Sequence, residues 1–180
     1  ADGAAADGGL IMDSLYTLTG WDLSELLPDA SEETFSARLA ALDTAVAAFE
    51  GQRGVLSADM APATLVDRVA QYEEILTQAY RLYGYASLWF SADTQSTTAL
   101  TFMNRVQQAL TSLQNRLLFF DLWWKELEDD EAAQLLPSAE LHPDYRFYLE
   151  DLRRTRRYTL DEKSEQLINL KPPVCWRGST

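Results

Sequence analysis

Apolar residues recur along the chain at alternating steps of three and four, the spacing that places side chains on one face of an α-helix. The longest unbroken run predicts a helix of roughly 30 residues, which would span ~45 Å at 1.5 Å per residue. Its apolar positions are Ala99, Met103, Val106, Leu110, Leu113, Leu117, Phe120, Trp124 and Leu127. Seams of this kind favour neighbouring helices that cross at about 20°.

Two more apolar stripes predict long helices upstream of this one. In the first, Ser31 is a favourable N-cap residue, and Gly51 and Gly54 follow the last apolar position. Its apolar positions are Phe35, Leu39, Leu42, Val46 and Phe49. The second opens at Pro62, where proline is tolerated, and a polar turn over residues 93–96 follows it. Its apolar positions are Leu65, Val69, Tyr72, Leu76, Ala79, Tyr83, Ala86 and Phe90.

Shorter segments complete the predicted architecture. An acidic helix begins at Asp129 and ends at Pro137, and Pro143 opens another. Thr159 and Glu162 form a capping-box pattern before a final helical segment over residues 161–170. Since no run alternates as a strand would, we predict an all-α fold: an elongated antiparallel bundle with three long helices and several short ones. An extended coiled coil is the alternative, which the aromatic content and the short links disfavour.

Two segments are too apolar for a single buried face. Residues 117–124 read LLFFDLWW, and residues 80–90 read YRLYGYASLWF. A helix that is apolar most of the way round must be covered on more than one side. These segments either form the centre of the bundle or face a second lobe or a partner chain, and both interpretations can hold together. The residues predicted for such an interlobe or oligomer surface are Phe119, Phe120, Trp123, Trp124 and Trp89.

Composition excludes several classes of partner and compartment. Apolar residues make up 47% of the 180 residues, which suits one folded domain, and the formal net charge is -13. Because this charge repels phosphate backbones and anionic lipid, we expect neither nucleic acid nor a membrane as partner. Cys175 is the only cysteine, so no intrachain disulfide can form, which fits a cytoplasmic location.

The sequence contains no motif of a hydrolytic zinc centre. Hydrolytic zinc sites need about three protein ligands, whereas the chain has a single histidine, His142, and no H-E-x-x-H motif. We therefore predict no catalytic residue, no metal ligand and no cofactor in this chain. A basic cluster is either an anion site, helped by Arg146, or a solvated helix end beside acidic residues, and the second interpretation is favoured. The cluster comprises Arg153, Arg154, Arg156 and Arg157.

The sequence divides into three parts by composition. Residues 1–17 read as a flexible leader or cloning scar, residues 18–171 as the helical unit, and residues 172–180 as a foreign-looking, unstructured tail.

Three segments together resemble the oligoendopeptidase F family of zinc metallopeptidases, within the thimet-oligopeptidase-like superfamily. The segment WDLSELLP at residues 21–28 is similar to that family's opening signature, and YRLYGYA at residues 80–86 resembles one of its tyrosine-rich helices. The strongest similarity begins at His142 and Pro143 and continues to Leu167. The residues that carry the resemblance are Trp21, Asp22, Leu23, Pro28, Tyr145, Tyr148, Leu149 and Arg156.

The resemblance, which covers about residues 18–170, implies a role without chemistry. In that family this region is the N-terminal helical lobe, which forms one wall of a deep cleft for short peptides. The zinc ligands and the catalytic glutamate lie far downstream, and none has a counterpart here. We therefore expect a chain that is inactive alone and that associates with the missing catalytic lobe or with itself as a dimer, with peptide as a further partner. A free-standing helical protein–protein interaction module is the alternative.

Overall fold

The computed structural model describes residues 22–136 and 143–170, and within these it contains α-helices and short 3-10 helices but no strand. The all-α prediction is thus confirmed. The elements are α1 (Glu32–Glu50), η1 (Arg53–Val55), α2 (Pro62–Ala92), α3 (Thr97–Glu126), α4 (Asp129–Leu135), α5 (Pro143–Arg154), η2 (Arg156–Tyr158) and α6 (Glu162–Leu170). The predicted leader, the predicted tail, Trp21, His142 and Cys175 lie outside the described residues.

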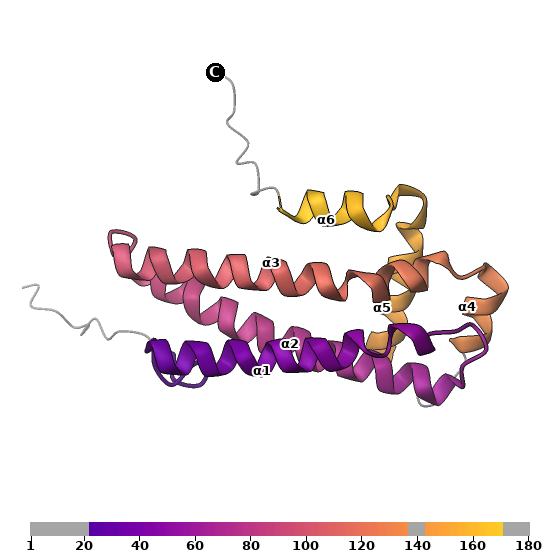
Figure 1. Cartoon of the computed structure of the whole chain (residues 1–180), viewed down its shortest axis with the longest axis horizontal. Helices are drawn as coiled ribbons and strands as arrows, with labels where there is room; N and C mark the ends of the chain where they lie inside the picture. Colours follow the sequence, from indigo (N-terminus) through magenta and orange to yellow (C-terminus); the bar gives the residue numbers. More distant parts are fainter. Residues whose placement is uncertain (1–21, 137–142, 171–180) are drawn as a thin grey trace, which may run out of the picture.

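The three long helices lie side by side and run in alternating directions, so the elongated antiparallel bundle is also confirmed (Figure 1). Helix α5 lies across one end of the bundle, and α6 runs along α3 on the side away from α1 and α2. Ion pairs fasten α1 to α3 at both ends: Arg105 binds Glu32 at 2.6 Å, and Arg116 binds Glu50 at 2.6 Å. Helices α2 and α3 are also adjacent to each other and antiparallel (Figure 1).

The predicted helix starts agree with the structure because each has a local cause. Helix α1 begins after Ser31, whose Oγ accepts a hydrogen bond from the Thr34 N–H at 3.2 Å. Helix α2 begins at Pro62, whose missing N–H would have no intrahelical partner in the first turn. The Ser96 Oγ caps α3 by accepting from the Ala99 N–H, also at 3.2 Å.

The buried face of α3 follows the predicted stripe with one exchange and two additions: Phe102 is buried whereas Met103 is half-buried, and Phe119 and Leu122 are buried as well. Phe102 takes the inner position because its ring packs against Phe35 at a centroid distance of 5.1 Å and against Trp89 at 5.4 Å. Toward the other end of the bundle, Phe49 of α1 packs against the rings of Tyr72 and Phe120. Aromatic contacts thus hold the three long helices together at both ends.

The predicted stripe of α2 is correct only in its first half. After Tyr72 the buried residues are Ile75, Leu82 and Ala86, whereas the predicted Leu76, Ala79 and Phe90 are half-buried and Tyr83 is exposed. Helix α2 is apolar on two neighbouring faces, and α1 and α3 cover only one of them. The face that carries Leu76, Ala79 and Tyr83 is left open to solvent.

The predicted cap of α6 also needs correction. The Thr159 Oγ1 donates to the Thr155 carbonyl instead of capping a helix. Helix α6 begins at Glu162, so the residue before it, Asp161, takes the N-cap role. Its Oδ1 accepts from the Lys163 N–H at 3.1 Å and from the Ser164 N–H at 3.2 Å.

Candidate functional site

The uncovered face of α2 forms one wall of an open groove, which we call the α2–α3 groove. Its volume is about 700 Å³, within the range of ~300–1,000 Å³ that is usual for ligand pockets. The α2 wall consists of Leu76, Ala79, Tyr80 and Tyr83, and the end of α6 closes one side with Asn169 and Leu170. Tyr80 is 61% exposed and Tyr83 39% exposed, so two aromatic rings face solvent.

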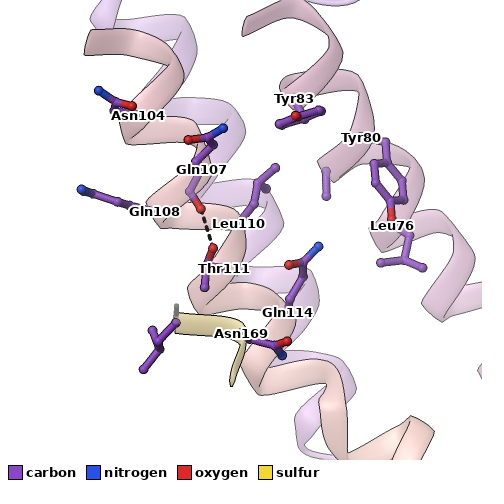
Figure 2. Close-up of a pocket in the computed structure, with 12 residues that line it drawn as sticks. Leu76, Tyr80, Tyr83, Asn104, Gln107, Gln108, Leu110, Thr111, Gln114 and Asn169 are labelled. Atoms are coloured by element: carbon purple, nitrogen blue, oxygen red, sulfur yellow. Dashed lines mark hydrogen bonds between the residues drawn. The ribbon is translucent and has the colours of Figure 1, made fainter. Parts of the chain in front are cut away.

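The opposite wall is a stripe of uncharged polar side chains on α3. Asn104, Gln107, Thr111 and Gln114 follow one another at steps of three, four and three, which puts them on one helix face. Figure 2 shows Gln107 and Gln114 on the side of α3 that faces Tyr80 and Tyr83. This stripe was not predicted, because the apolar positions of the same helix defined the face that was expected to be important.

The groove carries no formal charge at neutral pH, since none of the residues that line it is Asp, Glu, Lys or Arg. This is unusual for a chain with 28 acidic residues. The sequence offers a signal that could have found the site: no acidic residue occurs between Asp93 and Asp121, although acids are frequent elsewhere. A neutral groove therefore lies on a strongly acidic protein.

Three of the five residues predicted for an interlobe or oligomer surface are in the core. Phe119, Phe120 and Trp124 are buried, because α1 and α5 cover this part of α3 on several sides. These three cannot form a surface, and the interpretation of residues 117–124 as the bundle centre is correct for them. Trp123 and Trp89 are half-buried, and an interlobe role for these two remains a prediction.

The family-signature residues on α5 attach this helix to the long pair. Leu149 is fully buried, and the Tyr148 hydroxyl donates to Asp121 Oδ1 at 2.8 Å. The Tyr72 hydroxyl donates to Asp121 Oδ2 at 3.3 Å, so one carboxylate of α3 joins α2 and α5. Asp22, Leu23 and Pro28 belong to the segment that precedes α1 and take no part in this network.

Burial governs the protonation of this three-residue network. Desolvation raises the pKa of Asp121, and the hydrogen bonds from Tyr148 and Tyr72 oppose that rise. Desolvation and the nearby Asp121 carboxylate raise the pKa of both tyrosines, so their hydroxyls stay protonated and keep donating. In this network, the hydrogen bonds from the two tyrosines only partly compensate the desolvation of the half-buried Asp121 carboxylate.

This arrangement predicts a pH-dependent effect of the substitution Asp121→Asn. An acid whose folded pKa lies above its ordinary 3.8 binds more protons in the folded state, so its contribution to stability falls as pH rises above that value. Asparagine does not titrate. We expect the free energy of unfolding of Asp121→Asn, relative to the unsubstituted chain, to increase from about pH 4 upward. Urea denaturation at a series of pH values measures it.

The comparison has an internal control in Tyr148→Phe, which removes a donor that favours the charged carboxylate. In this background the pH-dependent gain from Asp121→Asn should be larger. A stability difference that stays constant across the acidic range would show that the fold does not desolvate Asp121.

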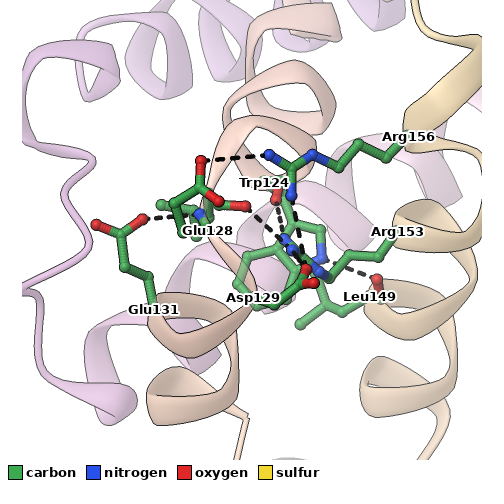
Figure 3. A network of polar contacts seen from close by, with 8 residues as sticks. Trp124, Glu128, Asp129, Glu131, Leu149, Arg153 and Arg156 are labelled. Atoms are coloured by element: carbon green, nitrogen blue, oxygen red, sulfur yellow. Dashed lines mark hydrogen bonds and ion pairs between the residues drawn. The ribbon is translucent and has the colours of Figure 1, made fainter.

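The arginine cluster is mostly a structural feature. Arg153 Nη1 donates to the Trp124 carbonyl at 3.1 Å and its Nη2 to the Leu127 carbonyl at 3.0 Å, and Arg153 also pairs with Asp129 (Figure 3). Arg156 lies 3.5 Å from Glu128. Carboxylates pair with Arg153, Arg154 and Arg156, in line with the favoured interpretation. The Arg153 side chain is not solvated, however: it is largely buried and attaches α5 to the end of α3, which the sequence did not indicate.

The described residues offer no metal centre and no membrane span. Within residues 22–136 and 143–170, no group of three or more His, Cys, Asp and Glu side chains could hold a metal ion. None of the helices in the same ranges is both long enough and apolar enough to cross a bilayer.

Comparisons with known proteins give one match. No curated protein matches the chain, and no solved structure matches it either. A family model described as oligopeptidase F, for the N-terminal region of that family, matches residues 123–175. These residues run from the last turn of α3 through α6, and they contain the network of Arg153 and the signature residues Tyr145, Tyr148 and Leu149. Over residues 123–175 the chain is therefore similar to the N-terminal region of the oligopeptidase F family.

Proposed function

We propose that this chain is the non-catalytic N-terminal lobe of an oligopeptidase F-like zinc peptidase and forms one wall of the enzyme's peptide cleft. The observation that carries the proposal is the family match over residues 123–175. The same residues make α4, α5 and α6, which brace one end and one side of the long helices. A braced, elongated bundle suits a wall better than a reaction centre.

The residues of the chain do not fit a hydrolytic zinc ion. Such a site takes about three protein ligands, usually His and Glu, and leaves a position for water. The chain has one histidine, and the described residues contain no suitable group of ligands. In this proposal the zinc ligands and the catalytic glutamate belong to a separate catalytic lobe.

The outer edge of α6 is the surface that we assign to contact with that lobe. Helix α6 turns polar residues toward the bundle: Glu162 binds Arg53 at 2.5 Å, and the Asn169 Nδ2 donates to Asn115 Oδ1 at 3.0 Å. Leu167 and Ile168 remain exposed on the same helix. Adjacent exposed apolar residues favour a covering partner.

Without the catalytic lobe, this edge is expected to drive self-association, in the simplest case as a symmetric dimer. Light scattering over a range of concentrations should give a mass above that of the monomer, and the substitution Leu167→Glu should restore the monomer. A matched change at an exposed apolar residue of α3, Leu100→Glu, should leave the association unchanged. A monomer at every concentration would contradict this part of the proposal.

The genomic reading frame beyond Leu170 tests the main proposal. A downstream H-E-x-x-H in the same frame would support it. An early stop codon with no downstream zinc motif would favour a free-standing interaction module instead. The purified chain provides a second test, because it should not cleave a quenched fluorescent oligopeptide when zinc is added. Cleavage that a chelator abolishes would contradict the proposal. A cellular location outside the cytoplasm would contradict the separate expectation that the parent enzyme is cytoplasmic.

A further inference from the structure

We propose that the α2–α3 groove binds a short, uncharged, extended segment of polypeptide. Its main chain would bond to the polar wall on α3, and its small side chains would pack against Tyr80 and Tyr83 on α2. The inference deepens the proposed function, on which it rests for the source of the peptide. Binding itself is a property of this chain and can be measured without a catalytic lobe.

The polar wall on α3 matches the hydrogen-bonding groups of an extended main chain. A carboxamide both donates and accepts, as a peptide group does. The side chains of Asn104, Gln107 and Gln114 line the groove and are exposed, and within the described part of the chain they make no hydrogen bond to protein. An extended segment has free N–H and C=O groups to offer them. A helical peptide uses its backbone N–H and C=O groups in intrahelical hydrogen bonds, so it would leave the carboxamides of this wall without partners.

The α2 wall supplies contact area. The rings of Tyr80 and Tyr83 are large, rigid and partly open to solvent, and Leu76 lies beside them. Burying such rings against small apolar groups is favourable, while the tyrosine hydroxyls can stay in water. The two walls therefore offer different chemistry to the two sides of an extended chain, whose successive side chains point in opposite directions.

The dimensions of the groove set the length of the occupant. From Asn104 to Gln114 the polar wall extends over ten residue steps of α3, about 15 Å at 1.5 Å per residue. An extended chain advances about 3.3 Å per residue, so four or five residues match this wall.

Charge selects a neutral occupant. No carboxylate or cationic side chain lines the groove, so a charged residue of the ligand would find no partner there. The net charge of -13 also repels an acidic segment from a distance. A basic segment would be attracted to the acidic surface as a whole, and this attraction weakens with salt.

The test is a titration of the ¹⁵N-labelled chain with acetyl-Ala-Val-Gly-Val-Ala-amide at about 0.15 M salt, followed by NMR. We expect a Kd on the order of 1 mM, with shifts concentrated in residues 76–83 and 104–114. The substitution Gln107→Met keeps the shape of the side chain and removes its hydrogen-bonding groups. It should weaken binding about fivefold, as expected for the loss of one net hydrogen bond. Gln134→Met, at an exposed glutamine of α4, should leave the Kd unchanged.

A second ligand tests main-chain recognition directly. The same peptide with N-methylated amides at alternate positions should bind at least about fivefold more weakly. N-methylation removes the peptide N–H groups that would donate hydrogen bonds to the carboxamide oxygens of the groove. Equal affinity for both peptides, shifts located mainly outside the groove, tighter binding of an amphipathic helical peptide, or occupation of the groove by a second copy of the chain would each overturn the inference. A downstream zinc motif combined with any of these results would leave the proposed function standing.

Discussion

The substitution Trp124→Ala is expected to remove about 3–5 kcal/mol from the free energy of unfolding, a large share of the ~5–15 kcal/mol typical of a domain. Trp124 is fully buried, and its Nε1 donates to the Leu149 carbonyl at 2.8 Å. The substitution would leave a large cavity between α3 and α5 and would remove the hydrogen bond that the indole donates to α5. We expect α5 to separate from the bundle at the lowest denaturant concentrations. Urea denaturation, followed by circular dichroism, measures the loss.

The neighbouring Trp123 is the matched control because it belongs to the same turn of α3 but is only half-buried. Trp123→Ala should cost clearly less. Trp124→Phe should fall between the two, since it retains one ring and loses the N–H donor and part of the buried volume. Equal losses for Trp123→Ala and Trp124→Ala would mean that α5 does not cover this end of α3 in solution.

The elements that the sequence predicted well are those with a local cause. A serine cap began α1, a proline began α2 and another began α5, and each of these acts within a few residues. The register of α3 was also predictable over most of its length, because the other helices pack against one continuous stripe of apolar side chains and Met103 is the one predicted position of that stripe that is not buried. Local capping residues and a continuous buried stripe leave few alternative registers.

Helix α2 shows why the groove could not be predicted from apolar spacing. Ile75 and Leu76 are adjacent and chemically alike, yet Ile75 is buried and Leu76 lines the groove. The difference depends on where α1 and α3 cross α2, which is a property of tertiary packing. Two faces of one helix carry the same kind of residue, so the sequence alone cannot say which face is left open.

The arginine cluster shows that the sequence also does not indicate which of two adjacent charged residues is buried. Arg153 and Arg154 are neighbours in the sequence at the end of α5, where cations suit the helix dipole. The Arg153 side chain is only 14% exposed, whereas that of Arg154 is 66% exposed. Helix α5 crosses the end of α3 at an angle that inserts one arginine and leaves the other in water. Nothing in the local sequence distinguishes the two.

The substitution Arg153→Met should therefore destabilise the chain by about 3 kcal/mol, the value of two hydrogen bonds from a charged donor to backbone carbonyls. The carbonyls of Trp124 and Leu127 lie at the C-terminal end of α3, where helices have carbonyls without an intrahelical partner. Methionine retains much of the apolar stem of arginine, so the measured loss reports the guanidinium rather than packing. Thermal and urea denaturation of the purified variant give the value.

Two further variants separate the geometry of Arg153 from its charge. Arg153→Lys keeps a cation near the negative end of α3, but a single ammonium on a flexible stem cannot reproduce the planar fork that reaches both carbonyls, so it should recover less than half of the loss. Arg154→Met removes an exposed cation whose nearest carboxylate, on Asp151, is 3.5 Å away, and it should cost less than about 0.5 kcal/mol. If lysine restored full stability, the role of Arg153 would be electrostatic and any cation at this helix end would suffice. Equal losses for Arg153→Met and Arg154→Met would instead contradict the attachment of α5 to α3 that positions the end of the bundle.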